Sequence, residues 1–156
     1  MIRRRDFAAA SLTAAALAAL EGFASANERA LVPADSAAAM YDKCARACSD
    51  CQRQCDGCAA YCAKALAKGS AHHFESLKSC IDCAALCATA AQIVARQGMA
   101  ADLICRACAE TCARCATECE RHGKDDQMMT RCAEECRKCE TACREMLAHA
   151  TPEASK

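Results

Sequence analysis

Aromatic residues are nearly absent from this sequence. Its 156 residues include no tryptophan, three phenylalanines and two tyrosines. Two of the phenylalanines, Phe7 and Phe23, lie within the first 26 residues, so the rest of the chain has very few large side chains for a core. A domain of this length normally offsets the entropy lost on folding with bulky aliphatic or aromatic packing. Some other interaction must therefore help to hold this chain together.

Proline and strand-forming residues are also scarce. The two prolines are Pro33 and Pro152, so no proline interrupts a helix between them. β-Branched residues are sparse and no period-two alternation persists, which argues against strands. The pattern instead predicts four helices, over residues 35–68, 71–97, 99–122, and from 125 or 126 to 150.

Short breaks separate these predicted helices. Gly69 is placed to end the first helix and Ser70 to cap the second, while Gly98 and Gly123 end the second and third. Either Asp125 or Asp126 can cap the fourth helix. Because short links between long helices make neighbours antiparallel, the sequence predicts an all-α, up-down-up-down four-helix bundle.

The chain has no excess of positive charge, since 20 Lys and Arg residues are balanced by 20 Asp and Glu residues. A near-neutral chain without a basic stripe argues against nucleic acid as a partner. The sequence also lacks a Ser/His/Asp set, paired catalytic carboxylates and a phosphate-binding glycine loop. We therefore do not expect an enzyme.

The N-terminus has the pattern of a targeting segment. Arg3-Arg4-Arg5-Asp6-Phe7 has a twin-arginine form, residues 8–20 are weakly apolar, and Ala24-Ser25-Ala26 is a small-x-small cleavage site. The apolar run is shorter than the roughly 20 residues that a membrane span needs. We expect residues 1–26 to be a twin-arginine signal peptide, residues 27–156 to form the bundle, and the mature protein to be periplasmic without a membrane span. A cytosolic protein with a basic N-terminus is the alternative.

Cysteine is the residue that the sequence has in excess. Consecutive cysteines within each predicted helix are three or four residues apart, which is the spacing of a helical seam that faces a bundle interior. The sequence therefore predicts that all 18 thiols line one shared core. They are Cys44, Cys48, Cys51, Cys55, Cys58, Cys62, Cys80, Cys83, Cys87, Cys105, Cys108, Cys112, Cys115, Cys119, Cys132, Cys136, Cys139 and Cys143.

This pattern allows three interpretations. Cysteine can act as a small core hydrophobe, but each one buries less area than leucine would. Disulfides suit an exported chain with an even cysteine count. Within one helix, however, residues three or four apart have Cβ atoms about 5–6 Å apart, whereas a disulfide needs about 3.5–4.5 Å; bridges between helices stay open. The third interpretation is a metal ion, which lengthens the bridge between two sulfurs.

A core made only of thiolates selects soft ions: Cu(I), with Zn(II) and iron–sulfur clusters as rivals. Zinc favours closed tetrahedra, and ferredoxin-type clusters use loop motifs in which a cysteine precedes proline, which never occurs here. Because buried thiolates need neutralising, about one monovalent ion per cysteine is expected. The sequence thus predicts high-capacity storage of multiple Cu(I) ions. The alternatives are an exported, disulfide-stapled helical protein and a zinc- or cadmium-sequestering protein.

Histidine and methionine gather near the predicted bundle ends. The expected topology brings together, at one end, His72, His73, His122, Met128 and Met129. These residue types can catch and pass copper, so we expect this end to be the metal entrance. The alternative is that the histidines are solvated loop residues and the methionines fill the core. The other end carries the apolar residues Tyr41, Leu103, Ile104 and Leu147 as an expected plug, together with Met40, Met99, Met146 and His149.

The chain resembles the four-helix-bundle copper storage proteins of bacteria, the Csp family. The resemblance rests on Cys44-x₃-Cys48-x₂-Cys51-x₃-Cys55-x₂-Cys58-x₃-Cys62, on His72-His73, and on Cys115-x₃-Cys119-x₂-His122. It implies that the 18 cysteines ligate copper, that the histidine end is the mouth, and that the chain forms homotetramers. Copper donor or acceptor proteins are further expected partners. The family has cytosolic and exported members. The cysteine and histidine pattern is more similar to the cytosolic ones, whereas the leader predicts export.

Overall fold

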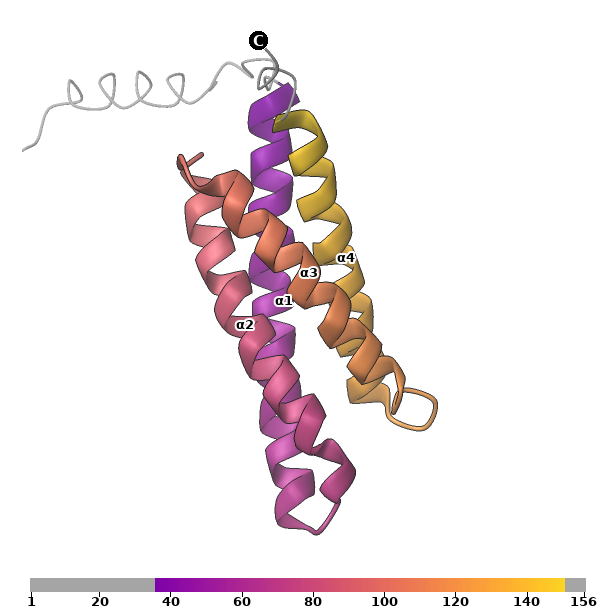
Figure 1. The fold of residues 1–156 in the computed structure, drawn as a ribbon. Helices are drawn as coiled ribbons and strands as arrows, with labels where there is room; N and C mark the ends of the chain where they lie inside the picture. Colours follow the sequence, from indigo (N-terminus) through magenta and orange to yellow (C-terminus); the bar gives the residue numbers. More distant parts are fainter. Residues whose placement is uncertain (1–35, 151–156) are drawn as a thin grey trace, which may run out of the picture. The chain divides into compact units, whose positions relative to one another are not determined.

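Four long helices and one short 3₁₀ turn make up residues 36–150, the part of the chain that the computed structural model describes (Figure 1). The elements are α1 (Ser36–Ala67), η1 (Ala71–His73), α2 (Phe74–Ala95), α3 (Ala101–Glu120) and α4 (Gln127–Ala150). The predicted signal peptide, residues 1–26, lies outside the described residues.

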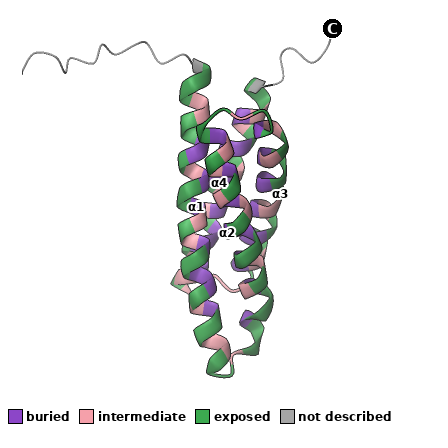
Figure 2. Ribbon diagram, turned by 90° about the vertical axis from the view of Figure 1, so that its left-hand side faces the viewer, coloured by how far each residue is buried: buried purple, intermediate pink, exposed green. Residues whose placement is uncertain are grey.

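The helices form the predicted up-down-up-down bundle. Each helix packs against its two neighbours in the ring α1–α2–α3–α4. Helices on the diagonals meet through their sulfur atoms in the interior, as between Cys44 and Cys105 at 3.7 Å and between Cys83 and Cys136 at 3.9 Å. The buried residues of all four face the interior (Figure 2). Because that interior is built almost entirely from cysteine and alanine, the helices enclose sulfur atoms where a bundle of this size usually encloses leucine.

The first interhelix turn is only partly as predicted. Gly69 adopts a left-handed conformation (φ 90°) just after α1, the conformation that glycine tolerates best at a helix end. Ser70 does not cap α2 with its side chain. Instead, the 3₁₀ turn η1 precedes α2, and this turn points His73 inward, where it is buried.

In the second interhelix turn, between α2 and α3, the residue with a left-handed backbone is not a glycine. α2 ends at Ala95, and Gln97, not Gly98, takes a left-handed conformation (φ 51°). Gly98 is needed for space: a Cβ there would lie 3.1 Å from Cγ2 of Ile93 and 3.2 Å from its carbonyl oxygen. The glycine thus permits the close return of the chain toward α3.

α2 is also long and apolar enough, by length and composition alone, to cross a membrane. Core helices of bundles pass the same test. In this fold α2 packs between α1 and α3, and its Cys80, Cys83 and Cys87 are completely buried among their cysteines. We therefore assign α2 to the bundle core.

Candidate metal centre

The 18 cysteines form one continuous column of sulfur atoms along the bundle axis. Every one is unbridged and has zero solvent exposure. Each helix supplies its own seam of thiols, so the prediction that all of them share a single interior is confirmed. The column runs from Cys62 and Cys119 near the histidine end to Cys44, Cys105 and Cys143 near the other.

Neighbouring sulfurs along this column are in contact. The Sγ atoms of Cys55 and Cys136 are 3.5 Å apart, and so are those of Cys87 and Cys112. A disulfide requires about 2.05 Å. The interhelix disulfides that the sequence left open are therefore absent among the described cysteines, and the staple interpretation is wrong. The spacing instead leaves sulfur atoms close enough to share a metal ion.

The sulfurs cluster in sets of four, and each set combines cysteines from several helices. Within each set, all Sγ atoms lie within 4.8 Å of one another. The sets include Cys48/Cys108/Cys139/Cys143, Cys51/Cys83/Cys87/Cys112, Cys51/Cys55/Cys83/Cys136, Cys55/Cys115/Cys132/Cys136 and Cys58/Cys80/Cys119/Cys132. Four of these five sets are joined by shared members such as Cys51 and Cys55. The remaining set is joined to them by contact, since Sγ of Cys108 lies 3.6 Å from Sγ of Cys87. The column is therefore a chain of linked sites.

Contacts between thiols also set their acidity. Hydrogen bonds from Cys119 and Cys132 lower the pKa of Cys115 far below its ordinary value, and the bond to Cys115 raises the pKa of Cys119. Likewise, a hydrogen bond from Cys112 lowers the pKa of Cys108 to about 2. A thiolate is stabilised by neighbours that stay protonated, so the metal-free column cannot ionise throughout. Cations are needed before all of its sulfurs can become thiolates.

The histidine end brings together the residues that the sequence singled out. The ring centroids of His72 and His122 are 5.3 Å apart, and those of His73 and His122 are 6.1 Å apart. Met129 is completely buried, with its sulfur 3.6 Å from Sγ of Cys58 and 3.9 Å from Sγ of Cys62.

The second methionine of this end lies to the side. Met128 is half-buried and accepts a hydrogen bond on its sulfur from Gln54 at 3.5 Å. Of the two methionines, Met129 thus contacts the sulfur column directly, while Met128 packs at its margin.

Two further buried polar atoms lie at this end, and one of them was not predicted from the sequence. Neither Nδ1 of His73 nor the hydroxyl of Ser76 has a hydrogen-bond partner among the described residues. Ser76 is four residues before Cys80 and fully buried, so it occupies the next position of the cysteine seam. That spacing was the signal that could have identified it. The histidine end thus continues the donor column with oxygen, nitrogen and thioether sulfur.

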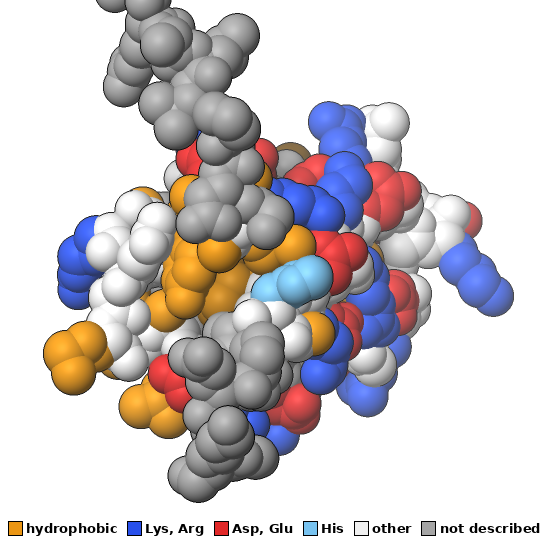
Figure 3. All heavy atoms as spheres, turned by 90° about the horizontal axis from the view of Figure 1, so that it is seen from above, with side chains coloured by type: hydrophobic (Ala, Val, Ile, Leu, Met, Phe, Trp, Pro, Cys, Tyr) orange, Lys and Arg blue, Asp and Glu red, His pale blue; other side chains and the backbone are white. Residues whose placement is uncertain are grey.

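The opposite end is apolar, as predicted. Seen from that end, hydrophobic side chains lie at the centre of the bundle, with a histidine side chain beside them (Figure 3). Met146 and Ala101 are buried there, and Met40, Tyr41, Ile104 and Leu147 pack against the core. Leu103 does not contribute to the plug, because 65% of it is exposed. Cys44, Cys105 and Cys143 are sealed beneath these side chains.

Known proteins are similar to this chain in sequence and in fold. Residues 37–148 match the family model described as copper storage protein. This chain belongs to the copper storage protein family. A search of curated proteins found no match.

Solved structures of other copper storage proteins are similar to this one. A cytosolic copper storage protein from Streptomyces lividans, loaded with five coppers, is 30% identical with a TM-score of 0.65; the match covers 72% of this chain and 95% of that one. The same protein with 10 copper equivalents is 31% identical with a TM-score of 0.64, over 70% and 85% of the two chains. The Cu(I)-bound copper storage protein of Bacillus subtilis is 30% identical with a TM-score of 0.62, over 69% and 98%.

The predicted export to the periplasm is contradicted by these relatives. The Streptomyces lividans protein, nearly all of which this chain matches, is described as cytosolic. The export prediction rested on the twin-arginine form of residues 3–7, the weakly apolar run 8–20 and the cleavage site Ala24-Ser25-Ala26, all of which lie outside the described residues. The described residues, which carry the cysteine and histidine pattern, place the copper storage protein among cytosolic relatives instead.

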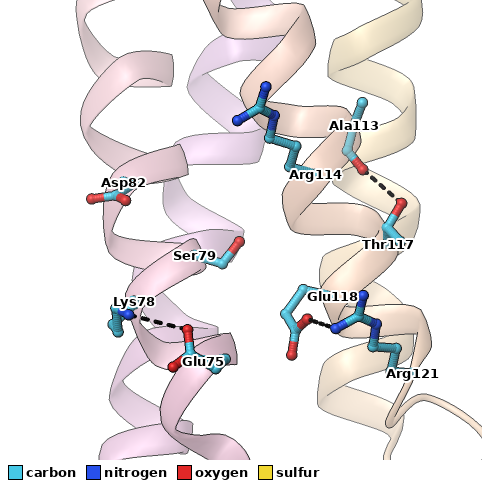
Figure 4. Close-up of a pocket in the computed structure, with 9 residues that line it drawn as sticks. All are labelled: Glu75, Lys78, Ser79, Asp82, Ala113, Arg114, Thr117, Glu118 and Arg121. Atoms are coloured by element: carbon cyan, nitrogen blue, oxygen red, sulfur yellow. Dashed lines mark hydrogen bonds and ion pairs between the residues drawn. The ribbon is translucent and has the colours of Figure 1, made fainter.

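A surface cavity of about 550 Å³ between α2 and α3 is not part of the metal centre (Figure 4). Its charged side chains are largely paired: Lys78 with Glu75, and Arg121 with Glu118. It is lined by Glu75, Lys78, Ser79, Asp82, Ala113, Arg114, Thr117, Glu118 and Arg121. None of these is a cysteine, so the copper storage protein keeps its soft donors inside the bundle.

Proposed function

We propose that this protein stores Cu(I), holding many ions along its sulfur column. The observation that carries the proposal is the column itself: 18 unbridged thiols with no solvent exposure, in sulfur–sulfur contact from one end of the bundle to the other. Thiolate ligands select soft ions, of which Cu(I) is the monovalent one that accepts low coordination numbers. The copper-loaded relatives support this choice of metal.

The capacity we propose is about one Cu(I) per cysteine, with the 18 thiols of the column as ligands. Each ion would take two or more thiolates, and each thiolate would bridge neighbouring ions, as the shared members of the four-sulfur sets allow. About 18 monovalent ions would then balance the charge of the thiolates. Divalent ions at the same ratio would leave a large positive excess, which disfavours a zinc or cadmium store.

We propose that copper enters at the histidine end, through His72, His73, His122, Met128 and Met129. The proximity of the three imidazole rings and the contact of Met129 with Cys58 and Cys62 support a path from borderline donors at the surface to soft donors inside. The apolar residues at the opposite end disfavour a polar route there.

We also propose that the protein acts as a store without catalysis and as a homo-oligomer, exchanging copper with donor or acceptor proteins. A second copy is supported by the outer face of α2, where Phe74 and Ile81 are each 53% exposed. They are seven residues apart on one helical face, and apolar side chains exposed in this way favour an interface between subunits. Light scattering of the purified protein measures the number of subunits.

Titration of the reduced, metal-free protein with Cu(I) against a calibrated chelator tests the storage function. We expect saturation near 18 equivalents, within a few, because each cysteine contributes about one site. Saturation at about four equivalents or fewer would contradict a continuous copper column. Parallel titrations with Zn(II), followed by competition, measure the preference for the monovalent ion.

A further inference from the structure

The structure closes the sulfur column at both ends. All 18 cysteines and Met129 have zero solvent exposure, and His73 is only 5% exposed. A copper ion in solution therefore cannot reach a thiol until some part of the bundle moves. Copper exchange therefore requires a segment at one end of the column to move.

The segment that closes the histidine end is the α3–α4 connection, residues 121–126, together with the first turn of α4. Met129, in that first turn, covers Cys58 and Cys62. The connection carries His122 and ends at Asp126, so it joins a surface histidine to the buried methionine. Its own backbone N–H groups make local hydrogen bonds: His122 N–H to Cys119 O at 3.1 Å, Gly123 N–H to Glu120 O at 3.3 Å and Asp126 N–H to Gly123 O at 3.4 Å. The hydroxyl of Thr130, in α4, also donates to the carbonyl oxygen of Gly123 at 2.6 Å.

Of the side-chain hydrogen bonds that tie this segment to α1, the shortest has oxygen as both donor and acceptor, whereas the others end on a methionine sulfur. The hydroxyl of Tyr61 donates to Oδ2 of Asp126 at 2.6 Å. The other carboxylate oxygen of Asp126 accepts the backbone N–H groups of Met128 (2.9 Å) and Met129 (3.2 Å), so it caps α4. Asp126 thus connects Tyr61 to the turn that positions Met129. The nearby contact from Gln54 to the sulfur of Met128 uses a weak acceptor at 3.5 Å.

Tyr61 is well placed for this role on its own helix. It directly precedes Cys62, and its ring makes an edge-to-face contact with the ring of His73, with centroids 5.6 Å apart. It therefore touches the buried histidine on one side and the α4 cap on the other. At the opposite end, the corresponding closure consists of packed apolar side chains, and exposing those to water is unfavourable.

We propose that Tyr61 and Asp126 are positioning residues whose hydrogen bond holds the histidine end closed. Breaking of this bond controls how fast copper enters and leaves the column. This inference rests on the proposed storage function. Neither residue is a copper ligand in this scheme. The pair alters the barrier to exchange and leaves the number of bound ions unchanged.

The test uses the full chain with Tyr61→Phe, which removes one hydroxyl and keeps the ring. The matched control is Tyr41→Phe, the same change in the tyrosine that packs at the apolar end. Stopped-flow spectroscopy follows Cu(I) loading from, and removal by, the chromogenic chelator bathocuproine disulfonate. Since a hydrogen bond to a charged group is stronger than a neutral one, we expect both rates to rise about tenfold in Tyr61→Phe. Capacity should match wild type, and Tyr41→Phe should keep wild-type rates.

A second variant, Asp126→Asn, keeps the α4 cap, because asparagine caps helices as well as aspartate. Its hydrogen bond with Tyr61 is uncharged, so its rates should fall between those of wild type and Tyr61→Phe. This role of the Tyr61–Asp126 hydrogen bond is refuted if Tyr61→Phe and Tyr41→Phe exchange copper at rates within about twofold of each other. It is equally refuted if Tyr61→Phe changes capacity, or if only loading or only removal accelerates. Failure of the storage function would instead appear as low capacity in the wild-type protein.

Discussion

The thioether sulfur of Met129 lies 3.6 Å from the Sγ of Cys58, inside a core built mostly from cysteine and alanine. Met129 is three residues before Cys132, so it continues the α4 seam by one position toward the histidine end. Met146, three residues after Cys143, continues the same seam at the other end and is also buried. One helix therefore presents two methionines in equivalent registers, only one of which lies at the proposed entrance.

Replacing Met129 by leucine should weaken copper binding at the histidine end without unfolding the protein. Leucine has nearly the same volume, so the cost to stability should stay below about 1.5 kcal/mol. The lost sulfur removes one soft donor beside Cys58 and Cys62. In competition with a chelator, Met129→Leu should release about one more equivalent of Cu(I) than the control Met146→Leu. Equal retention by the two variants would show that the Met129 sulfur is not a ligand.

Cysteines in the middle of the column should matter more for capacity than those at its end. Sγ of Cys136 lies within 3.9 Å of the sulfurs of Cys51, Cys55 and Cys83, whereas Cys62 lies beside Met129 at the margin. Bridging thiolates serve two ions, so Cys136→Ser should lose about two equivalents at saturation and Cys62→Ser about one. Metal analysis after gel filtration measures both. An equal loss in the two variants would argue for isolated sites.

Much of this site follows from sequence periodicity, and the exceptions have physical causes. The three- and four-residue cysteine steps place every thiol correctly, because a helix converts that spacing into one face. The same rule, extended by one step, reaches Ser76 and Met129. The Tyr61–Asp126 bond could not be predicted, since it joins residues 65 positions apart whose proximity depends on how α1 and α4 pack.

Local backbone details were less predictable. Gly69 has the left-handed backbone that its position after α1 suggests. In the next turn the left-handed residue is Gln97, and Gly98 is instead needed because Ile93 leaves little room for a side chain there. Ser70 was expected to cap α2 and does not, because η1 takes over the start of that helix. Such choices depend on tertiary contacts, which residue types alone do not reveal.

Copper loading should stabilise the fold strongly. The metal-free core consists of cysteine and alanine, which bury little apolar area each. An ion that binds only the folded state adds about 4 kcal/mol per site when its free concentration is about 1,000 times the dissociation constant. Thermal unfolding followed by circular dichroism should therefore give a much higher midpoint for the loaded protein. Identical midpoints for the two forms would contradict binding inside the bundle.

Acid should destabilise the metal-free protein through His73. Burial first, and then the neighbouring His72, lower the pKa of His73 below its ordinary value of 6.5. Above pH 6.5 the side chain is neutral in both folded and unfolded chains, so stability is unaffected. As pH falls through 6.5, the unfolded chain takes up the proton first, and stability decreases until the lower folded-state pKa is passed.

The matched variant for this effect is His73→Gln, which cannot titrate. Urea unfolding at pH about 8 and about 5 should show a larger loss of stability on acidification for wild type than for His73→Gln. An NMR titration should place the midpoint of His73 below 6.5. A midpoint above that value would mean that Asp126, whose charge favours the protonated ring, outweighs burial.

Gly57, in the middle of α1, offers a stabilising substitution. A Cβ at this position would meet no atom within 4 Å, and the residue has an ordinary helical conformation. Alanine there loses less conformational freedom on folding, so Gly57→Ala should stabilise the metal-free protein by about 0.5–1 kcal/mol. Gly69→Ala is the contrasting variant, because its left-handed backbone (φ 90°) disfavours any side chain and should make it less stable than wild type.

Urea unfolding of both variants measures these changes, and copper capacity should be the same in each, since neither glycine faces the sulfur column. A destabilised Gly57→Ala protein would indicate that another subunit packs against the exposed side of α1 at this point.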